Sequence, residues 1–384
     1  MTTLLPNRNR VIALQRLVWR NLRRPDESLV DIAVENGIIA EISPAGTRGE
    51  PGEGTDCEGR LYVSSGWIDL HVHAFPEFEP YGDEIDEIGV KQGVAVVVDA
   101  GSCGADRIGE LLSAGKNAAT RLFAFLNISR IGLSRIDELS RLEWIDPALA
   151  ARAASEHPDS IVGFKARISR SVVGSSGLIP LQMARKLSDD TGLPLMVHIG
   201  SGPPDIREIV PLLSDGDVLT HCFHGKKNGL FDEAGQPLGV LRDALKRGVR
   251  LDVGHGTASF SFRTAEAAGR AGIRPHTIST DIYRGNRSNG PVYSLANVMT
   301  KFLHLGYSLE EVVSSVTDRA ASWLGKPELG RIRVGDPANL TLFSIENGRT
   351  TLIDSEGEER IAHTRIEPRG VVTGGQFLKC EVRT

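Results

Sequence analysis

The sequence has few cysteines, no long apolar run and no strong excess of one charge. The four cysteines among 384 residues, Cys57, Cys103, Cys222 and Cys380, are too few and too far apart for a disulfide framework or a Cys-x-x-Cys zinc site. No window approaches the roughly 18 apolar residues of a membrane span, and the first 14 residues contain no export signal. The net charge of −5, with lysines and arginines scattered, argues against nucleic acid or membrane as the partner. These absences predict a cytoplasmic protein with a small-molecule substrate, and they leave room for a homo-oligomer.

Apolar segments of five to nine residues recur from residue 67 onward, and amphipathic helical stretches separate most of them. The predicted strands are 67–73, 94–101, 121–129, 161–168, 195–199, 218–223, 249–253 and 276–281. The predicted helices between and after them are 106–119, 178–191, 239–247, 264–271, 295–305 and 309–324. Eight strands covered on both faces are what a closed (β/α)8 barrel of the α/β class requires. An open doubly wound sheet is the alternative, although no Gly-x-Gly-x-x-Gly follows the first strand.

The two ends of the chain have a different pattern from its middle. Residues 11–19, 29–42 and 57–63 read as short strands, and Asn36-Gly37 indicates a hairpin turn. Short strands return from Arg331 to the end. We therefore predict a discontinuous β-sandwich domain formed by residues 1–63 and 331–384, with the barrel, residues 64–330, inserted in it.

Polar residues of a restricted kind stand at the ends of the predicted barrel strands. These are His71 and His73 after the first strand, Lys165 in the fourth, His198 in the fifth, His221 and His224 after the sixth, His255 after the seventh and Asp281 after the eighth. His71 and His73 are two residues apart, so in a strand their imidazoles share one face. One strand-end histidine by itself is usually solvated, but six of the ten histidines lie at such ends, where barrel enzymes carry their chemistry.

This arrangement resembles the amidohydrolase superfamily over nearly the whole chain. The motifs that carry the resemblance are "GWIDLHVH", Lys165, His198, His221, Asp281 and the tail "GRIRVGDPANLTLF". Within the superfamily, "THCFHG", "DVGHG" and "STD" are most similar to predicted metallohydrolases described as dihydroorotase-like or deacetylase-like.

The resemblance implies a binuclear metal site, with zinc the expected metal. His71, His73 and Asp281 would bind one ion, His198 and His221 the second, and Lys165, carboxylated by carbon dioxide, would bridge them. A free ammonium would repel two cations, whereas a carbamate is an anionic oxygen ligand. A bridging hydroxide would attack the substrate, and Asp281 would accept its proton and pass it to the leaving group.

The resemblance implies hydrolysis of an amide or ester acyl bond of a small molecule, such as an N-acyl amino acid or an acylated hydroxy acid. His224, His255 and Arg284 are candidates for substrate binding, with a structural role for each histidine as the alternative. Dihydroorotases typically have an arginine two residues after the His-x-His pair, where this chain has Phe75. The alternatives are a cyclic amide hydrolase, a mononuclear deaminase and a relative without catalytic activity.

Overall fold

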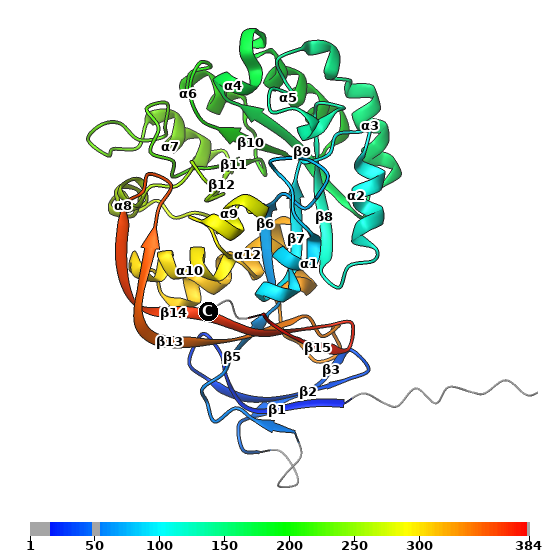
Figure 1. Ribbon diagram of the computed structural model, residues 1–384, viewed down its shortest axis with the longest axis vertical. Helices are drawn as coiled ribbons and strands as arrows, with labels where there is room; N and C mark the ends of the chain where they lie inside the picture. Colours follow the sequence, from blue (N-terminus) through cyan, green and yellow to red (C-terminus); the bar gives the residue numbers. More distant parts are fainter. Residues whose placement is uncertain (1–15, 48–53, 382–384) are drawn as a thin grey trace, which may run out of the picture.

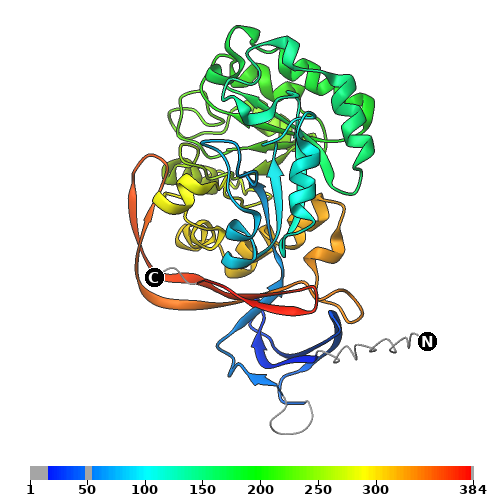
Figure 2. The same cartoon turned by 45° about the vertical axis from the view of Figure 1, so that its right-hand side comes forward.

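The computed structural model of the protein describes residues 16–47 and 54–381. It has two parts: parallel strands surrounded by helices, and an antiparallel sheet to which both ends of the chain contribute (Figures 1 and 2). None of the described helices combines the length and the apolar composition that crossing a bilayer requires.

Seven parallel strands follow one another in chain order around the barrel. They are β6 (Trp67–Val72), β7 (Val94–Ala100), β8 (Arg121–Asn127), β9 (Ile161–Ile168), β10 (Leu195–Ile199), β11 (Val218–Thr220) and β12 (Arg250–Asp252). Most of their residues are buried, because helices cover one side and the barrel interior the other. The barrel fold predicted from the sequence is confirmed.

The eighth position is occupied by a segment that is not a regular strand. Parallel bridges join Asp252 to Thr277 and Val72 to Ile282, so residues 277–282 lie between β12 and β6. The Asp281 N–H donates to the His71 carbonyl at 2.7 Å, and the His73 N–H donates to the Ile282 carbonyl at 2.9 Å. The predicted strand 276–281 therefore closes the barrel, but Asp281 adopts a left-handed conformation with φ of 53° and interrupts the ladder.

The helices cover the outside of the barrel and the face toward the antiparallel sheet (Figure 1). They are α1 (Ile85–Ile88), α2 (Ile108–Gly115), α3 (Pro147–Glu156), α4 (Arg170–Val173), α5 (Ile179–Thr191), α6 (Ile206–Ile209), α7 (Gly239–Lys246), α8 (Phe262–Arg270), α9 (Arg284–Asn289), α10 (Leu295–His304), α11 (Leu309–Ser315) and α12 (Asp318–Trp323). The predicted stretch 309–324 is two helices, because Thr317 between them has φ −130° and ψ −97°. Ser308 begins the first of the two with a capping box to Glu311.

The antiparallel sheet joins the two ends of the chain. Its strands are β1 (Arg16–Arg23), β2 (Leu29–Glu35), β3 (Ile38–Pro44), β4 (Thr55–Asp56), β5 (Tyr62–Ser65), β13 (Leu340–Ile353), β14 (Glu359–Thr373) and β15 (Gln376–Lys379). Their hydrogen bonds run in the order β15-β14-β13-β5-β1-β2-β3, with β4 beside β1, so they form one connected sheet. The Asn36-Gly37 turn between β2 and β3 has φ of 52° and 79°, as a two-residue hairpin requires. Residues 11–15 of the first predicted strand lie outside the described residues.

The β13–β14 hairpin is long enough to leave the sheet and run along the barrel toward α8 (Figures 1 and 2). At its base, Phe343 of β13 packs against Trp67 of β6, with ring centroids 5.3 Å apart. The Trp67 N–H also donates to the Thr341 hydroxyl at 3.1 Å. The first barrel strand is thereby anchored to the antiparallel sheet immediately before the His71-x-His73 pair.

Candidate active site

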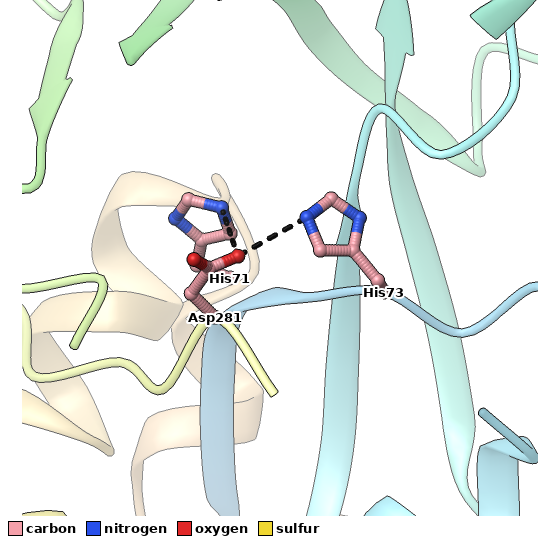
Figure 3. Close-up of side chains that lie close together, drawn as sticks. All are labelled: His71, His73 and Asp281. Atoms are coloured by element: carbon pink, nitrogen blue, oxygen red, sulfur yellow. Dashed lines mark ion pairs between the residues drawn. The ribbon is translucent and has the colours of Figure 1, made fainter. Parts of the chain in front are cut away.

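Two imidazoles and a carboxylate meet where the barrel closes. His71 Nε2 and His73 Nε2 lie 3.3 and 3.1 Å from Asp281 Oδ1. Figure 3 shows both rings directed toward this carboxylate. One ligand atom from each residue lies within 4.8 Å of the others, and both histidines are almost fully buried. The group is able to hold a divalent metal ion, since imidazole nitrogen and carboxylate oxygen are ordinary ligands for such ions.

Lys165, His198 and His221 complete the same cluster from neighbouring strands. Lys165 Nζ lies 3.0 Å from His71 Nε2, and His221 Nε2 lies 2.8 Å from His198 Nδ1. The ring centroids of His71 and His221 are 5.1 Å apart. All six residues predicted as metal ligands are therefore brought together by the barrel.

Burial determines the charges of this cluster. It lowers the pKa of His71 to about 4, and it lowers the pKa values of His198 and His221 well below the ordinary value. Burial also lowers the pKa of Lys165 to about 7. For Asp281, burial by itself would raise the pKa, but the neighbouring imidazoles, His71 first, outweigh it and hold the pKa far below its usual range. His71, His198 and His221 are thus neutral beside an ionised carboxylate, which is the protonation state that metal binding requires.

Buried hydrogen-bond partners behind the cluster, one a side chain and one a backbone carbonyl, fix the tautomers of two histidines. The Thr220 hydroxyl donates to Asp252 Oδ2 at 2.7 Å, so His71 Nδ1, 2.8 Å from the same hydroxyl oxygen, must be the donor of the second bond. His221 Nδ1 donates to the Gly254 carbonyl at 2.6 Å. Each bond leaves the lone pair of Nε2 directed into the cluster, as a ligand needs.

Sequence reasoning missed three buried aspartates around the ligands. Asp252 also accepts hydrogen bonds from Thr277 and Ser279, and Asp69 accepts one from the Thr280 N–H just before Asp281. Asp99 accepts bonds from the backbone of residues 74 and 102 beside His73. Each is a buried carboxylate in a largely apolar barrel strand, where burial is costly unless the carboxylate is hydrogen-bonded. This was a usable signal in the sequence.

Two glycines of the "DVGHG" segment leave room for the ligands. Gly254 has φ of 46°, and a Cβ there would lie 2.8 Å from His221 Nδ1 and 3.0 Å from His71 Nδ1. Gly256 has φ of 54°, and a Cβ there would collide with the Asp281 carboxylate. Both the left-handed backbone and the close approach demand glycine.

A cavity of about 200 Å³ opens beside the cluster. It is lined by His71, His73, Tyr81, Leu133, Lys165, Arg167, Ser169, Ser171, His198, Ser201, Lys226, Thr257, Ala258, Ser259, Asp281 and Tyr283. Arg167 pairs with the buried Glu138 at 3.3 Å. Lys226 is half-buried and has no acidic partner within ion-pair distance among the described residues. The cavity is polar, and Arg167 and Lys226 add two cationic side chains to its lining.

The three residues predicted to bind substrate do not line this cavity. His255 Nε2 accepts a hydrogen bond from Lys301 Nζ at 2.7 Å, and its ring stacks on Phe260. His224 accepts a bond from the backbone N–H of Lys226 and faces a neighbouring cavity. Arg284 is 46% exposed and pairs with Glu79 at 3.3 Å. The structure favours the structural alternative for His255, and a substrate contact by His224 or Arg284 stays a prediction.

Phe75, at the position of the dihydroorotase arginine, is also outside the cavity lining. Its ring packs edge-on against Phe78 with centroids 4.8 Å apart, and the Arg107 guanidinium lies 4.7 Å above it. Phe75 is 3% exposed and belongs to the core. Tyr81 is the aromatic residue of this loop that reaches the cavity.

Comparison with known proteins agrees with the geometry. Residues 332–378 match the model of a deacetylase-like composite domain. A protein of Enterococcus faecalis named deacetylase is 44% identical over 350 residues, which cover 91% of this chain and 95% of that one.

Two solved structures share the fold over almost their full length. An adenine deaminase has a TM-score of 0.90 at 42% identity, covering 94% of this chain and 99% of its own. A dihydroorotase has a TM-score of 0.88 at 32% identity, covering 96% of this chain and 98% of its own. The chain therefore belongs to the deacetylase-like family of the amidohydrolase superfamily, whose members are metal-dependent hydrolases.

Proposed function

We propose that the cluster holds two divalent metal ions, with zinc as the expected metal. His71, His73 and Asp281 would bind one ion, and His198 and His221 the other. The presence of five donor side chains in one cluster supports this assignment, because a single tetrahedral zinc uses four.

Lys165 would bridge the two ions as a carbamate. Its pKa of about 7 keeps a large fraction of the amine neutral near physiological pH, and the neutral amine is the form that reacts with carbon dioxide. The nitrogen then gives up a proton and gains a carboxylate group, which turns a cation into an oxygen ligand. The amine lies 3.0 Å from His71 Nε2, so the new oxygens would stand among the metal ligands.

The reaction we propose is hydrolysis of an acyl bond of a small molecule. Bound divalent metal supplies Lewis acidity toward the acyl carbonyl and lowers the pKa of water. Asp281, ionised beside the imidazoles, would accept the proton of the attacking water and pass it to the leaving nitrogen or oxygen. Tyr283, whose pKa is raised by burial, stays protonated and would donate a hydrogen bond to the substrate from the cavity wall.

The cavity favours a substrate that carries a carboxylate beside its acyl group. Lys226 has no acidic partner within ion-pair distance among the described residues, and Arg167 shares its charge with one carboxylate only. An anion bound there would gain charge-assisted hydrogen bonds. An N-acyl amino acid or an acylated hydroxy acid fits this requirement, and the relative from Enterococcus faecalis is named a deacetylase. Lys226 and Arg167 are thus proposed as carboxylate-binding residues in addition to Arg284, which stays a prediction.

The cyclic amide hydrolase is the second candidate, since one solved neighbour is a dihydroorotase and its substrate is also an anion. The test compares kcat/KM for dihydroorotate and adenine with kcat/KM for acetylated amino acids and acetylated hydroxy acids. We expect at least one acetylated compound to exceed about 10,000 M⁻¹s⁻¹, the lower range for natural substrates. Turnover of dihydroorotate at that level, with no reaction of the acetylated compounds, would assign the cyclic reaction instead.

We also propose a reducing compartment, the cytoplasm. All four cysteines are free and buried, and no two of them form a disulfide in the structure. Burial raises the pKa of Cys57 to about 11 and that of Cys380 to about 12, so these thiols are inert.

A further inference from the structure

The turn of the β13–β14 hairpin reaches the barrel loops that form the substrate cavity. Ile353 pairs with Glu359 at the last position of the hairpin, and residues 354–358 form its turn. Figures 1 and 2 show the hairpin running along the side of the barrel to the level of α8. The turn thus connects two strands of the antiparallel sheet, but it lies beside the active-site loops.

The first half of the turn is bonded to the loop that follows β12. Ser355 donates its backbone N–H to the Phe260 carbonyl at 3.0 Å and its hydroxyl to the Gly256 carbonyl at 2.9 Å. The Phe260 N–H donates back to the Ser355 hydroxyl at 3.2 Å. Asp354 Oδ2 accepts the Phe262 N–H at 3.0 Å. This loop carries Gly256, against the Asp281 carboxylate, and the cavity-lining residues 257–259.

Glu356 connects that loop to the loop that follows β11. Its Oε2 accepts a hydrogen bond from the Ser261 hydroxyl at 2.7 Å and pairs with Arg263 at 3.1 Å. Its other oxygen lies against Gly225, where a Cβ would collide with it. Gly225 immediately precedes Lys226, the cavity lysine without an acidic partner within ion-pair distance in the described chain. The Glu356 carboxylate therefore contacts both of the loops that supply the outer wall of the cavity.

The turn is rigid enough to act as a template. Asp354 is 1% exposed, and its Oδ1 accepts the backbone N–H groups of Glu356 and Glu358, each at 2.8 Å. These bonds fix the backbone from which the Glu356 side chain extends. The turn belongs to the antiparallel sheet and not to the barrel loops. It can therefore hold the loop after β11 and the loop after β12 at a fixed distance from each other.

We infer that Glu356 is a positioning residue that sets the distance of Lys226 from residues 257–259, and thereby the affinity for the carboxylate of the substrate. The inference rests on the proposed acyl hydrolase function. Glu356 does not line the cavity, so its removal should change substrate binding more than the chemical step.

The experiment uses the metal-loaded full chain and three variants. Glu356→Ala removes the bonds to Ser261 and Arg263, and Glu356→Gln keeps an acceptor for the Ser261 hydroxyl. Glu358→Ala is the matched control, because Glu358 lies on the same turn but pairs with Arg360 of the hairpin itself at 2.6 Å. Hydrogen–deuterium exchange of segments 224–229 and 256–263 reports on the loops without any substrate. Steady-state kinetics with the best acetylated acid of the panel separates KM from kcat.

We expect Glu356→Ala to raise KM about tenfold with kcat changed less than about twofold, which corresponds to the loss of one charge-assisted hydrogen bond. Exchange in both segments should accelerate at least about fivefold, while metal content stays unchanged. Glu356→Gln should keep KM and the exchange rates close to the wild-type values. Glu358→Ala should change neither KM nor exchange.

The inference is overturned if Glu356→Ala leaves exchange of both segments unchanged, or if Glu358→Ala accelerates it equally. It is also overturned if kcat falls as much as kcat/KM. Failure of the whole acetylated panel in the wild-type protein would instead count against the proposed function, and the exchange measurement would still decide whether Glu356 holds the loops.

Discussion

Lys165 is the residue whose chemistry depends most on its surroundings. Its side chain is 1% exposed, with Met196 Sδ 3.3 Å and His71 Nε2 3.0 Å from the amine. Neither neighbour stabilises an ammonium as a carboxylate would, so desolvation dominates and the pKa falls to about 7. A largely neutral amine is the form that the proposed carboxylation of Lys165 requires.

We therefore expect Lys165→Ala to lose metal and activity together, and a small carboxylate such as propionate in the buffer to restore part of both. The bridge needs only oxygen ligands, and a diffusible acid can enter the space of the lost side chain. Loss of an outer partner of a ligand already costs roughly 10 to 100-fold in metal affinity, so loss of the bridge should cost at least as much. Elemental analysis and turnover measure the effect.

Lys246→Ala is the control for this variant, because Lys246 is exposed on α7 and pairs with Asp243 at 3.6 Å. It should keep wild-type metal content, near two equivalents. Wild-type turnover in Lys165→Ala, or a reproducible content near one equivalent in the fully active wild-type protein, would contradict the bridged site.

At the scale of elements, the loop after β12 fits around the ligands only because its glycines have no side chain. The Gly256 N–H donates to the Thr280 carbonyl at 2.8 Å, so the loop runs beside the segment that ends in Asp281. The pattern "DVGHG" indicated a strand end with a histidine, but it could not show which carboxylate the glycines face. That depends on the barrel closing between β12 and β6.

Gly256→Ala should therefore displace the Asp281 carboxylate, lower the metal content and reduce kcat/KM by about 100-fold or more, as expected for loss of a proton-transfer group. Gly272→Ala is the matched control, because Gly272 has φ of 72° but nothing within 4 Å of a Cβ. Both variants should lose roughly 1 to 2 kcal/mol of stability from left-handed backbone strain, measured by urea unfolding. Only Gly256→Ala should lose metal. Equal metal content in the two variants would show that the contact with Asp281 is unimportant.

At the scale of the whole molecule, a buried lysine links a helix to the active-site loop. Lys301 of α10 donates to His255 Nε2 at 2.7 Å and to the Pro291 carbonyl at 2.8 Å. A neutral amine has two N–H groups, which these two acceptors use. Burial lowers the pKa of Lys301 from its ordinary value of 10.5 to about 7.

This shift predicts a pH dependence of stability. Between pH 7 and 10.5 the unfolded lysine is protonated and the folded one is largely neutral, so the unfolded state binds more protons and the free energy of unfolding rises with pH. The limiting slope is about 1.4 kcal/mol per pH unit. Below pH 7 the contribution is flat, because both states are protonated.

Lys301→Met should lose this part of the slope in urea unfolding at pH 7, 8 and 9, because methionine does not titrate. Lys186→Met, at an exposed lysine of α5 that pairs with Asp190, is the control and should keep the wild-type slope. Parallel pH dependences of Lys301→Met and the wild type would refute the assignment.

The sequence by itself determined the barrel, the hairpin at Asn36-Gly37 and which polar residues stand at the ends of the barrel strands. These follow from short-range rules: apolar segments of strand length, the two-residue period that places His71 beside His73, and the convergence of parallel strand ends. The antiparallel sheet could also be predicted from the sequence. Both ends of the chain have a pattern of short strands, which differs from the alternation of strands and helices in the middle.

Only the tertiary structure decided which polar residues line the cavity and which pair with other side chains outside it. His255 and Arg284 have the same composition signals as true cavity residues, yet Lys301 and Glu79 occupy them, while Arg167 and Lys226 reach the cavity. The bond of Glu356 to Ser261 joins residues 95 positions apart, and its contact with Gly225 joins residues still farther apart. Such pairings arise from packing between segments that are distant in the sequence. A local periodic pattern does not show which of these segments come into contact. Local pattern fixes where a strand ends, and long-range packing fixes what meets its last side chain.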